Sequence, residues 1–322
     1  MAILDTQVFK AIEYLEQGEL VAIPTETVYG LAANAFNENA VANIFKVKNR
    51  PSFDPLIVHS SSLNKAVDFT QTISDETWKL AEAFCPGPIT FIIKKNSKIS
   101  DLVTAGHDTV GIRIPRHPLT QLLLESLDFP LAAPSANPFG FVSPTTAQHV
   151  EDQLGNKIPL ILDGGPATVG VESTIVDTSE AEIKILRLGG LALEEIEETL
   201  NRKIDHIQTS SSSPKAPGML TSHYSPGCPL ILGPIKWDEL EKNEPIGLLY
   251  FGGKPKVLNN IVPFGLSESS LLEEAAQNLF KGLRFFANQK VSKVYAEKLP
   301  EIGLGRAIND RLIRAATKIT SA

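Results

Sequence analysis

The sequence predicts an α/β protein with two domains, a larger one around a mixed, partly antiparallel sheet and a smaller one around a parallel sheet. Three observations favour this fold class. The length of 322 residues exceeds that of one typical domain. Strand-like and helix-like runs mix without a strict rhythm in the first part of the chain and alternate more regularly in the last part. Between these parts, residues 207–218 (IQTSSSSPKAPG) have the composition of a linker.

The first predicted domain contains short apolar strands separated by amphipathic helices. In residues 8–18 (VFKAIEYLEQG), Phe9, Ile12 and Leu15 fall on one helical face, and Gly18 ends the helix. A buried strand follows and runs into a polar turn. Further helices are predicted at residues 39–47, 74–84, 117–127, 143–155 and 191–200, and strands at residues 20–23, 55–59, 89–95, 109–115, 129–137, 159–165, 172–178 and 183–188.

Two of these helices have recognisable starts. Ser74 or Asp75 can cap the helix over residues 74–84. Ser143, followed by Pro144, has the pattern of an N-cap with proline at the first helical position. Both positions offer a side-chain oxygen to the unpaired N–H groups of a first turn.

The second predicted domain, of about 95 residues, alternates strands and helices as a small parallel sheet does. Strands are predicted at residues 229–233, 246–253, 260–266 and 293–299, and helices at residues 237–242, 269–289 and 306–316. The nearest match to GxGxxG, GLGRAI at residues 303–308, lacks the third glycine and is better explained as a turn into a helix.

Composition excludes several classes of protein. With 30 Lys plus Arg against 37 Asp plus Glu, the chain lacks the charge of a broad nucleic-acid-binding surface. Two distant cysteines, Cys85 and Cys228, predict neither a disulfide framework nor a zinc site. The N-terminus lacks the pattern of a signal peptide, and no apolar run reaches the roughly 20 residues of a spanning helix. We expect a cytoplasmic protein without GxxxxGK[ST], HExxH or GxSxG chemistry.

Polar side chains recur at the ends of the predicted strands, in loops that a rigid scaffold would hold. Such loops concentrate binding residues, so the arrangement predicts one pocket. The residues are Thr25, Glu26, Thr27, Lys48, Arg50, His59, Arg113, Ser135, Asn137, Ser173, Thr174 and Arg187.

The cations among them also have ordinary explanations. Lys48 and Arg50 follow a helix whose negative end favours positive charge. Arg113 lies on the strand face opposite to Ile112 and Ile114, and there it is either solvent-facing on an edge strand or paired with an anion. Arg187 is by default one half of a surface ion pair.

The uncharged candidates have ordinary roles too. His59 would be satisfied at its strand end, Ser135 and Asn137 would form turns beside prolines, and Ser143 would cap a helix. Taken together, however, three arginines, a lysine and several hydroxyls at strand ends of an acidic protein predict a common ligand. A small polyanion is the simplest one, because guanidinium groups suit carboxylates or phosphates and lysine acts as a point charge on phosphates.

Eight segments occur in a characteristic order: PTETVYGLAANA, KVKNRPSFDPLIVH, CPGPIT, VGIRIPRHP, APSAN, SPT, GVESTIVD and ILRLG. Together they closely resemble the YrdC/TsaC family of threonylcarbamoyl-AMP synthases. The segment PGMLTSHYSP and the additional C-terminal domain resemble the long, two-domain type. The resemblance implies a YrdC-like catalytic domain at residues 1–204, with a twisted mixed sheet and a deep positively charged cavity. A linker at residues 205–228 and a smaller Rossmann-like domain at residues 229–322 would follow.

The resemblance also implies an activity. Members of this family are nucleotidyltransferases that make threonylcarbamoyl-AMP and pyrophosphate from L-threonine, bicarbonate and ATP. Mg²⁺ is expected to be held through ATP, with no metal ligand assigned to protein side chains. The product would pass to a tRNA threonylcarbamoyl transferase complex for the N6-threonylcarbamoyladenosine modification. The resemblance is compatible with a weak contact to tRNA and implies no membrane partner.

Site residues follow from the same resemblance. Lys48 and Arg50 match the KxR motif of the family and are implied in catalysis, and Ser135 and Asn137 match its SxN motif. The implied ATP-binding residues are Lys48, Arg50, Asp54, Thr109, Ser135, Asn137, Ser143, Arg187 and Tyr224. The implied threonine-binding residues are Thr27, His59, Arg113 and Ser173. Asp54 departs from the asparagine of many relatives, and the linker lacks the Lys-Tyr-Arg run that many place before His-Tyr.

Two alternatives of other classes remain open at this stage. An RNA-binding module would bind tRNA in a salt-dependent manner without turning over ATP. A carbamoyl-transfer or nucleotide-binding regulatory protein on the same fold would release pyrophosphate from carbamoyl phosphate and ATP without threonine.

Overall fold

The computed structural model describes residues 1–206, 217, 224–235, 244–255 and 260–320. The chain divides into two compact units, the first formed by residues 1–139, 143–168 and 172–220 and the second by residues 140–142, 169–171 and 221–322. The two short loops at 140–142 and 169–171 therefore pack with the C-terminal part of the chain, although their neighbours in sequence belong to the first unit.

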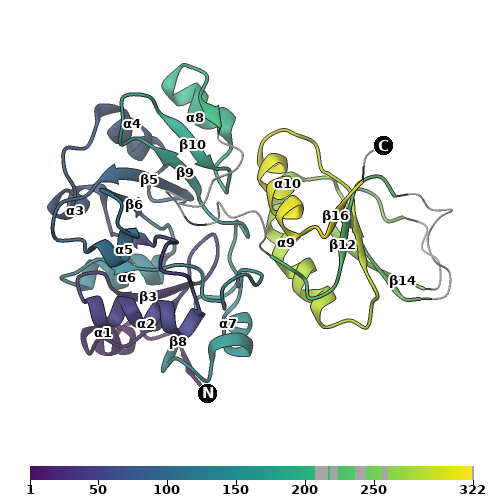
Figure 1. The fold of residues 1–322 in the computed structure, drawn as a ribbon, viewed down its shortest axis with the longest axis horizontal. Helices are drawn as coiled ribbons and strands as arrows, with labels where there is room; N and C mark the ends of the chain where they lie inside the picture. The colour runs from purple at the N-terminus through teal and green to yellow at the C-terminus, as the bar shows by residue number, and fades with distance from the viewer. Residues whose placement is uncertain (207–216, 218–223, 236–243, 256–259, 321–322) are drawn as a thin grey trace. The chain divides into compact units, whose positions relative to one another are not determined.

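The first unit is built on a mixed sheet (Figure 1). Its strands are β1 (Ile3–Asp5), β2 (Val21–Ile23), β3 (Gly30–Asn34), β4 (Ile57–His59), β5 (Ile89–Lys94), β6 (Thr109–Arg113), β7 (Leu131–Ala132), β8 (Leu160–Leu162), β9 (Thr174–Asp177), β10 (Lys184–Arg187) and β11 (Asp205–His206). They lie in the order β1-β8-β2-β3-β7-β4-β6-β5-β9-β10-β11. β4 pairs with β6 in parallel, whereas β5 pairs with β6 in antiparallel fashion. The predicted mixed sheet is confirmed, and each predicted strand of this unit contains an observed one; β1, β3 and β11 lie outside the predictions.

Helices pack around this sheet (Figure 1). They are α1 (Val8–Glu16), α2 (Glu38–Lys48), α3 (Leu63–Ala66), the 3-10 helix η1 (Val67–Phe69), α4 (Asp75–Phe84), α5 (Asp101–Thr104), α6 (Pro118–Ser126), α7 (Ala147–Leu154) and α8 (Leu193–Leu200). α1 and α6 contact each other, and their apolar side chains form one core with β2, β3 and β8. Burying a Leu or Ile side chain in such a core contributes roughly 1.5–3 kcal/mol.

The buried face of α1 differs from the predicted one. Val8, Ala11 and Leu15 are buried, whereas Phe9 is 53% exposed. The prediction for Phe9 is therefore wrong. The buried set follows the spacing of three and four residues that aligns side chains along one helical stripe, and Phe9 lies off that stripe.

Capping residues explain where several helices begin and end. The Ser74 side chain caps α4, as predicted, by accepting from the Thr77 N–H. The predicted cap at Ser143 is wrong, because α7 begins after Thr146, whose side chain accepts from the His149 N–H. α2 ends at Lys48, and Asn49 follows in the left-handed conformation with φ of 52°. This turn directs the chain from Lys48 toward the loop that carries Arg50.

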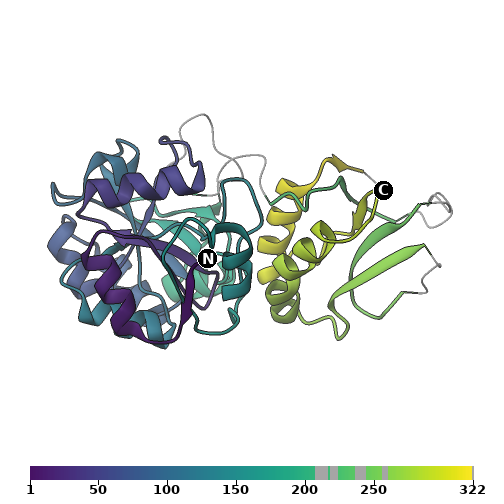
Figure 2. The same ribbon diagram turned by 90° about the horizontal axis from the view of Figure 1, so that it is seen from below.

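The second unit contains a five-stranded sheet within the residues that the structure describes, with all its pairings parallel. Its elements are β12 (Leu230–Leu232), β13 (Ile246–Phe251), β14 (Ile261–Ser267), α9 (Leu272–Ala287), β15 (Val294–Ala296), α10 (Leu304–Ala315) and β16 (Lys318–Ile319). Both helices lie side by side on one face of the sheet (Figure 2). The parallel sheet and the turn into a helix at Gly303 are confirmed, while the predicted helix at 237–242 lies outside the described residues. Among the described helices, none has the length and apolar character needed to cross a membrane.

Candidate functional site

The carboxyl ends of β4 and β6 bring His59 and Arg113 together. These residues are register partners in the parallel pair, and both are buried. Because β6 lies between β4 and β5, Arg113 is on a central strand. The solvent-facing alternative for Arg113 is therefore wrong. The anion-paired alternative is confirmed, since Arg113 makes an ion pair with a carboxylate.

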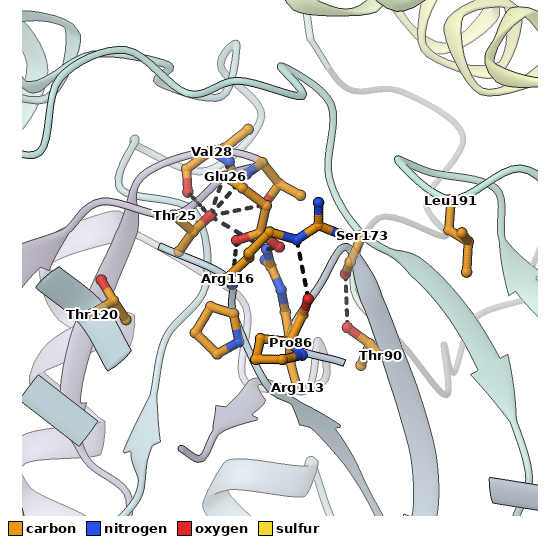
Figure 3. Close-up of polar contacts among 12 residues, drawn as sticks. Thr25, Glu26, Val28, Pro86, Thr90, Arg113, Arg116, Thr120, Ser173 and Leu191 are labelled. Atoms are coloured by element: carbon orange, nitrogen blue, oxygen red, sulfur yellow. Dashed lines mark hydrogen bonds and ion pairs between the residues drawn. The ribbon is translucent and has the colours of Figure 1, made fainter. Parts of the chain in front are cut away.

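That carboxylate belongs to Glu26, in the loop between β2 and β3 (Figure 3). Arg113 Nη2 donates to Glu26 Oε1 at 2.8 Å, and the backbone N–H of Arg116 donates to Glu26 Oε2 at 2.9 Å. The side chains of Arg113 and Glu26 are 6% and 5% exposed. Arg113 Nε is also buried and has no hydrogen-bond partner within the described residues.

A hydroxyl network holds the same loop. Thr25 Oγ1 donates to the Val28 carbonyl at 2.7 Å and accepts from the N–H groups of Thr27 and Val28. It also lies 2.9 Å from Thr27 Oγ1 and 3.4 Å from Arg113 Nη2. Thr25 therefore fixes Thr27 and faces the guanidinium group in a buried turn.

Electrostatics at this end of the site follow from burial and from Arg113. Burial alone would raise the pKa of Glu26, but the charge and hydrogen bond of Arg113 and the N–H of Arg116 outweigh it and lower that pKa. Burial, followed by the repulsion of Arg113, lowers the pKa of His59 to about 3. His59 is thus neutral near pH 7, and its Nδ1 has no partner within the part of the chain that the structure describes.

Ser173 joins this region to β10. Its Oγ lies 2.7 Å from Thr90 Oγ1, and Thr90 is the register partner of Arg113 on β5. Arg187 donates through Nη2 to the Ser173 carbonyl at 2.9 Å and to its hydroxyl at 3.2 Å, and through Nη1 to the Pro217 carbonyl at 3.0 Å. Because Arg187 is buried against these groups, the surface ion pair expected by default is wrong.

Lys48 defines a second end of the candidate site. Its side chain is buried, and Nζ donates to the backbone carbonyls of Ser135, at 2.5 Å, and Asn137. A solvated lysine at a helix end would not be buried in this way. Lys48 therefore connects the end of α2 to the segment after β7, and the lysine of the KxR motif contacts the backbone of both polar residues of the SxN motif.

Arg50 is held by the loop that follows it. Nε donates to the Asp54 carbonyl at 3.1 Å and Nη2 to the Pro55 carbonyl at 2.8 Å, while Nη2 lies 2.9 Å from Asp54 Oδ2. Asp54 Oδ1 is buried without a partner in the described residues. Asp54 is thus an internal counter-ion of Arg50.

Burial dominates the electrostatics of this second cluster. It lowers the pKa of Lys48 well below its usual value, with a further contribution from Arg50, and it raises the pKa of Asp54. Lys48, Arg50 and Arg187 all act on the Asp54 carboxyl electrostatically, so these groups form one interacting set. Burial disfavours the charged forms of Lys48 and Asp54 alike, so an added anion would be favoured here because it would stabilise the cationic form of Lys48.

The remaining predicted residues lie apart from these contacts. Ser143 Oγ donates to Glu172 Oε1 at 2.7 Å, and both residues are buried. Thr109 begins β6 and pairs with Lys94, so it lies at the opposite end of that strand from Arg113. Tyr224 belongs to the second unit, where its ring stacks on Phe280 with centroids 5.2 Å apart.

The sequence predicts Glu26 as a pocket residue without indicating its partner, and it gives no indication of Glu172; the structure places both acids in these networks. Glu26 lies 87 positions from Arg113 and Glu172 lies 29 positions from Ser143, so only the fold reveals their partners. The sequence does contain a feature that predicts a partner for Glu26. Its carboxylate lies between two threonines directly after an apolar strand, and a carboxylate buried there requires a cation. Across the described residues, no group of three or more His, Cys, Asp or Glu side chains could hold a metal ion.

Family models match nearly the whole chain. A Sua5/YciO/YrdC model described as "Telomere recombination" matches residues 13–189, and one described as "Threonylcarbamoyl-AMP synthase, C-terminal domain" matches residues 191–317. A threonylcarbamoyl-AMP synthase of Pyrococcus abyssi is 40% identical over 321 residues, covering 95% of this chain and 93% of that relative. One of Bacillus subtilis is 38% identical over 323 residues, covering 97% and 93%.

Solved structures agree with these relatives. P. abyssi Sua5 complexed with L-threonine superposes with a TM-score of 0.91 at 36% identity, covering 100% of this chain and 99% of that one. E. coli YciO has a TM-score of 0.53 at 22% identity and covers 59% of this chain and 96% of its own, which supports the fold of the first unit alone.

Proposed function

Because the chain belongs to the Sua5/YciO/YrdC family, we propose that it is a threonylcarbamoyl-AMP synthase acting on L-threonine, bicarbonate and ATP. The observation that carries the proposal is the presence in one unit of two buried cation clusters with different counter-charges. One is a single arginine matched by one carboxylate, and the other combines Lys48 and Arg50 with the weaker acid Asp54. An amino acid with one carboxylate suits the first cluster, and a polyphosphate suits the second.

At the first cluster, Arg113 binds the threonine carboxylate, with Thr27, His59 and Ser173 around the substrate. The neutral imidazole of His59 adds no second positive charge beside Arg113, and it offers a ring nitrogen to a polar group of the substrate. Thr27 and Ser173 supply hydroxyls that can discriminate a hydroxylated side chain from an apolar one.

At the second cluster, Lys48 and Arg50 bind the phosphates and act in catalysis. Each cation is already oriented by backbone carbonyls, so little reorganisation is needed when charge develops. The other residues proposed for the ATP site are Asp54, Thr109, Ser135, Asn137, Ser143 and Arg187. Tyr224 belongs to the second unit, and its assignment to ATP stays a prediction from the family resemblance. The described side chains form no metal site of their own, so Mg²⁺ enters this proposal only as a companion of the nucleotide.

The reaction is a nucleotidyl transfer. The threonine amine combines with bicarbonate to give a carbamate and water. A carbamate oxygen then bonds to the α-phosphorus of ATP, the bond from that phosphorus to the bridging oxygen breaks, and pyrophosphate leaves with the electron pair. Such transfers depend mainly on positioning and charge neutralisation, which the two cation clusters provide.

The product is a labile adenylate that a tRNA threonylcarbamoyl transferase complex would consume, in the cytoplasm. In this proposal residues 1–204 are the catalytic domain, residues 205–228 the linker and residues 229–322 a second domain.

Purified protein with ATP, Mg²⁺, bicarbonate and labelled threonine tests the proposal. We expect pyrophosphate together with an adenylate that contains threonine, and loss of both when threonine or bicarbonate is omitted. Pyrophosphate release that is unchanged by either omission would contradict the proposal.

A further inference from the structure

We propose that Glu26 is a positioning residue for substrate recognition: it fixes the guanidinium of Arg113 so that one N–H remains directed at the carboxylate of the amino-acid substrate. The inference rests on the proposed function and assigns to Glu26 a role in it. Glu26 touches Arg113 and not the reacting atoms.

The two oxygens of Glu26 are held from two directions. Oε1 accepts from Arg113 Nη2 at 2.8 Å, and Oε2 accepts from the backbone N–H of Arg116 at 2.9 Å (Figure 3). Because the Arg116 N–H belongs to the main chain, the carboxylate cannot turn without losing a hydrogen bond. The orientation of Glu26 therefore sets the orientation of the guanidinium group.

Within the described residues, the Arg113 guanidinium contacts its partners through one nitrogen, Nη2. Nη2 contacts both Glu26 and Thr25 Oγ1, whereas Nε is buried without a partner in the described residues. Buried donors are nearly always satisfied in native proteins, so an orphan N–H on a central strand indicates a place for a ligand acceptor. A substrate carboxylate supplies such an acceptor with the matching charge.

Glu26 also joins two residues of the proposed threonine site. It lies directly between Thr25, which contacts Arg113, and Thr27, whose hydroxyl lies 2.9 Å from Thr25 Oγ1. The Glu26 side chain contacts Arg113, and Thr25 contacts both Arg113 and the Thr27 hydroxyl, so one loop holds both residues of the proposed threonine site. A buried ion pair that served stability alone would not need its carboxylate in the same loop, between β2 and β3, as Thr27.

A role for Glu26 as the base that deprotonates the threonine ammonium group is disfavoured. Arg113 and the Arg116 N–H lower the pKa of Glu26 against the effect of burial, so its carboxylate is a weak proton acceptor. The negative charge of Glu26 also neutralises Arg113. Without Glu26, Arg113 would be a buried, unpaired cation that attracts other small anions.

The Glu26→Gln variant tests the inference, because Gln keeps the shape of Glu but presents an N–H₂ group to one of the two donors. We expect the KM for threonine to rise at least about tenfold, the equivalent of about 1.4 kcal/mol, while the KM for ATP stays within about twofold. Discrimination between threonine and threoninamide should fall as well, because it depends on an oriented Arg113.

Asp310→Asn is the matched control. It removes a carboxylate that pairs with Arg314 at 2.9 Å in the second unit, and it should leave both KM values unchanged. If Glu26→Gln does not fold, Glu26→Asp keeps the charge with a shorter reach, and the same rise in the threonine KM is expected. An unchanged or lower threonine KM in the folded variant would overturn the inference. Wild-type protein without threonine-dependent pyrophosphate release would instead reject the proposed function itself.

Discussion

The Arg113 and Lys48–Arg50 clusters are both buried cation sites, but their counter-charges differ. Arg113 is matched by Glu26, whose pKa is lowered, so that pair is neutral as a unit. Within the described residues, Lys48 and Arg50 share one acid, Asp54, whose pKa is raised by burial, and their other partners are backbone carbonyls. A neutral pair can orient one carboxylate without attracting polyanions, whereas a cluster with excess positive charge attracts phosphates. In the proposed function, this difference assigns threonine to the first cluster and ATP to the second.

The largest effect is expected from removing a cation of the second cluster. Lys48→Met and Arg50→Ala should each lower kcat about 100-fold to 1,000-fold, because oriented charges at a phosphate contribute on that scale. Steady-state pyrophosphate release measures the loss, and circular dichroism checks that the variants are folded.

Lys46→Met is the control for these variants. Lys46 lies in the same last turn of α2 but is exposed. If the helix end explained both lysines, the two lysine variants would lose similar stability, about 0.3–1 kcal/mol, and neither would lose activity. That result would mean that Lys48 only stabilises the helix end and that the second cluster has no role in binding phosphates.

Arg113→Lys should have the next largest effect. Lysine retains the charge but not the planar fork, so it cannot contact Glu26 and a substrate carboxylate in the same geometry. We expect kcat/KM for threonine to fall about 100-fold, on the scale of a lost charge-assisted hydrogen bond, with the KM for ATP little changed. Equal losses for both substrates would show that Arg113 does not belong to a separate threonine site.

Titration of His59 provides a pH test confined to the first cluster. Its pKa falls from an ordinary value of 6.5 to about 3 on folding, so the unfolded chain binds the proton first. The stability linked to neutral His59 is therefore complete above pH 6.5 and is lost as the pH falls toward 3.

His59→Gln removes this titration. Between pH 6.5 and 4, the free energy of unfolding of the wild type should fall more steeply than that of the variant, by up to about 1.4 kcal/mol per pH unit. Chemical denaturation at several pH values measures both slopes. Parallel slopes would mean that the pKa of His59 does not fall on folding, so that the imidazole is protonated below pH 6.5 and then adds a second positive charge to the first cluster.

The smallest expected effects distinguish the hydroxyl of Thr146, which caps α7, from that of Ser143, which is proposed to lie in the nucleotide site. Thr146→Ala should cost about 1 kcal/mol of stability through the lost cap of α7 and leave activity unchanged. Ser143→Ala should leave the cap intact and raise the KM for ATP, because Ser143 contacts Glu172 and belongs to the proposed nucleotide site. Reversal of these two outcomes would restore Ser143 as the cap of α7.

Local patterns predicted most elements of the fold. Periodicity and capping signals located the helices over 38–48 and 75–84 and the strands that carry His59 and Arg113. The predictions failed at the cap of α7 and at the strands β1 and β11, where contacts between distant parts of the chain decide the structure. Ser143 and Thr146 are both competent caps, and tertiary contacts decide between them. β1 and β11, of three and two residues, are edge strands whose pairing depends on distant partners.

The sequence predicts a set of residues for the candidate site but not their charge arrangement. The order of motifs predicts Lys48, Arg50 and Arg113 as site residues, and their partners lie in separate parts of the chain. The Glu26 carboxylate on Arg113 and the carbonyls of Ser135 and Asn137 on Lys48 arise only when strands distant in sequence meet. Burial then sets the directions of the pKa shifts at Lys48, Asp54 and His59, and the Arg113 charge outweighs it at Glu26; no local pattern encodes these directions.

Calorimetric titration of two variants tests the central claim most directly. L-threonine and a non-hydrolysable ATP analogue are each titrated separately into the wild type, Arg113→Lys and Lys48→Met. The account predicts reciprocal losses: Arg113→Lys loses affinity for threonine and keeps that for the nucleotide, and Lys48→Met shows the opposite pattern. Loss of both ligands to the same extent in each variant would contradict the assignment of one substrate to each cluster.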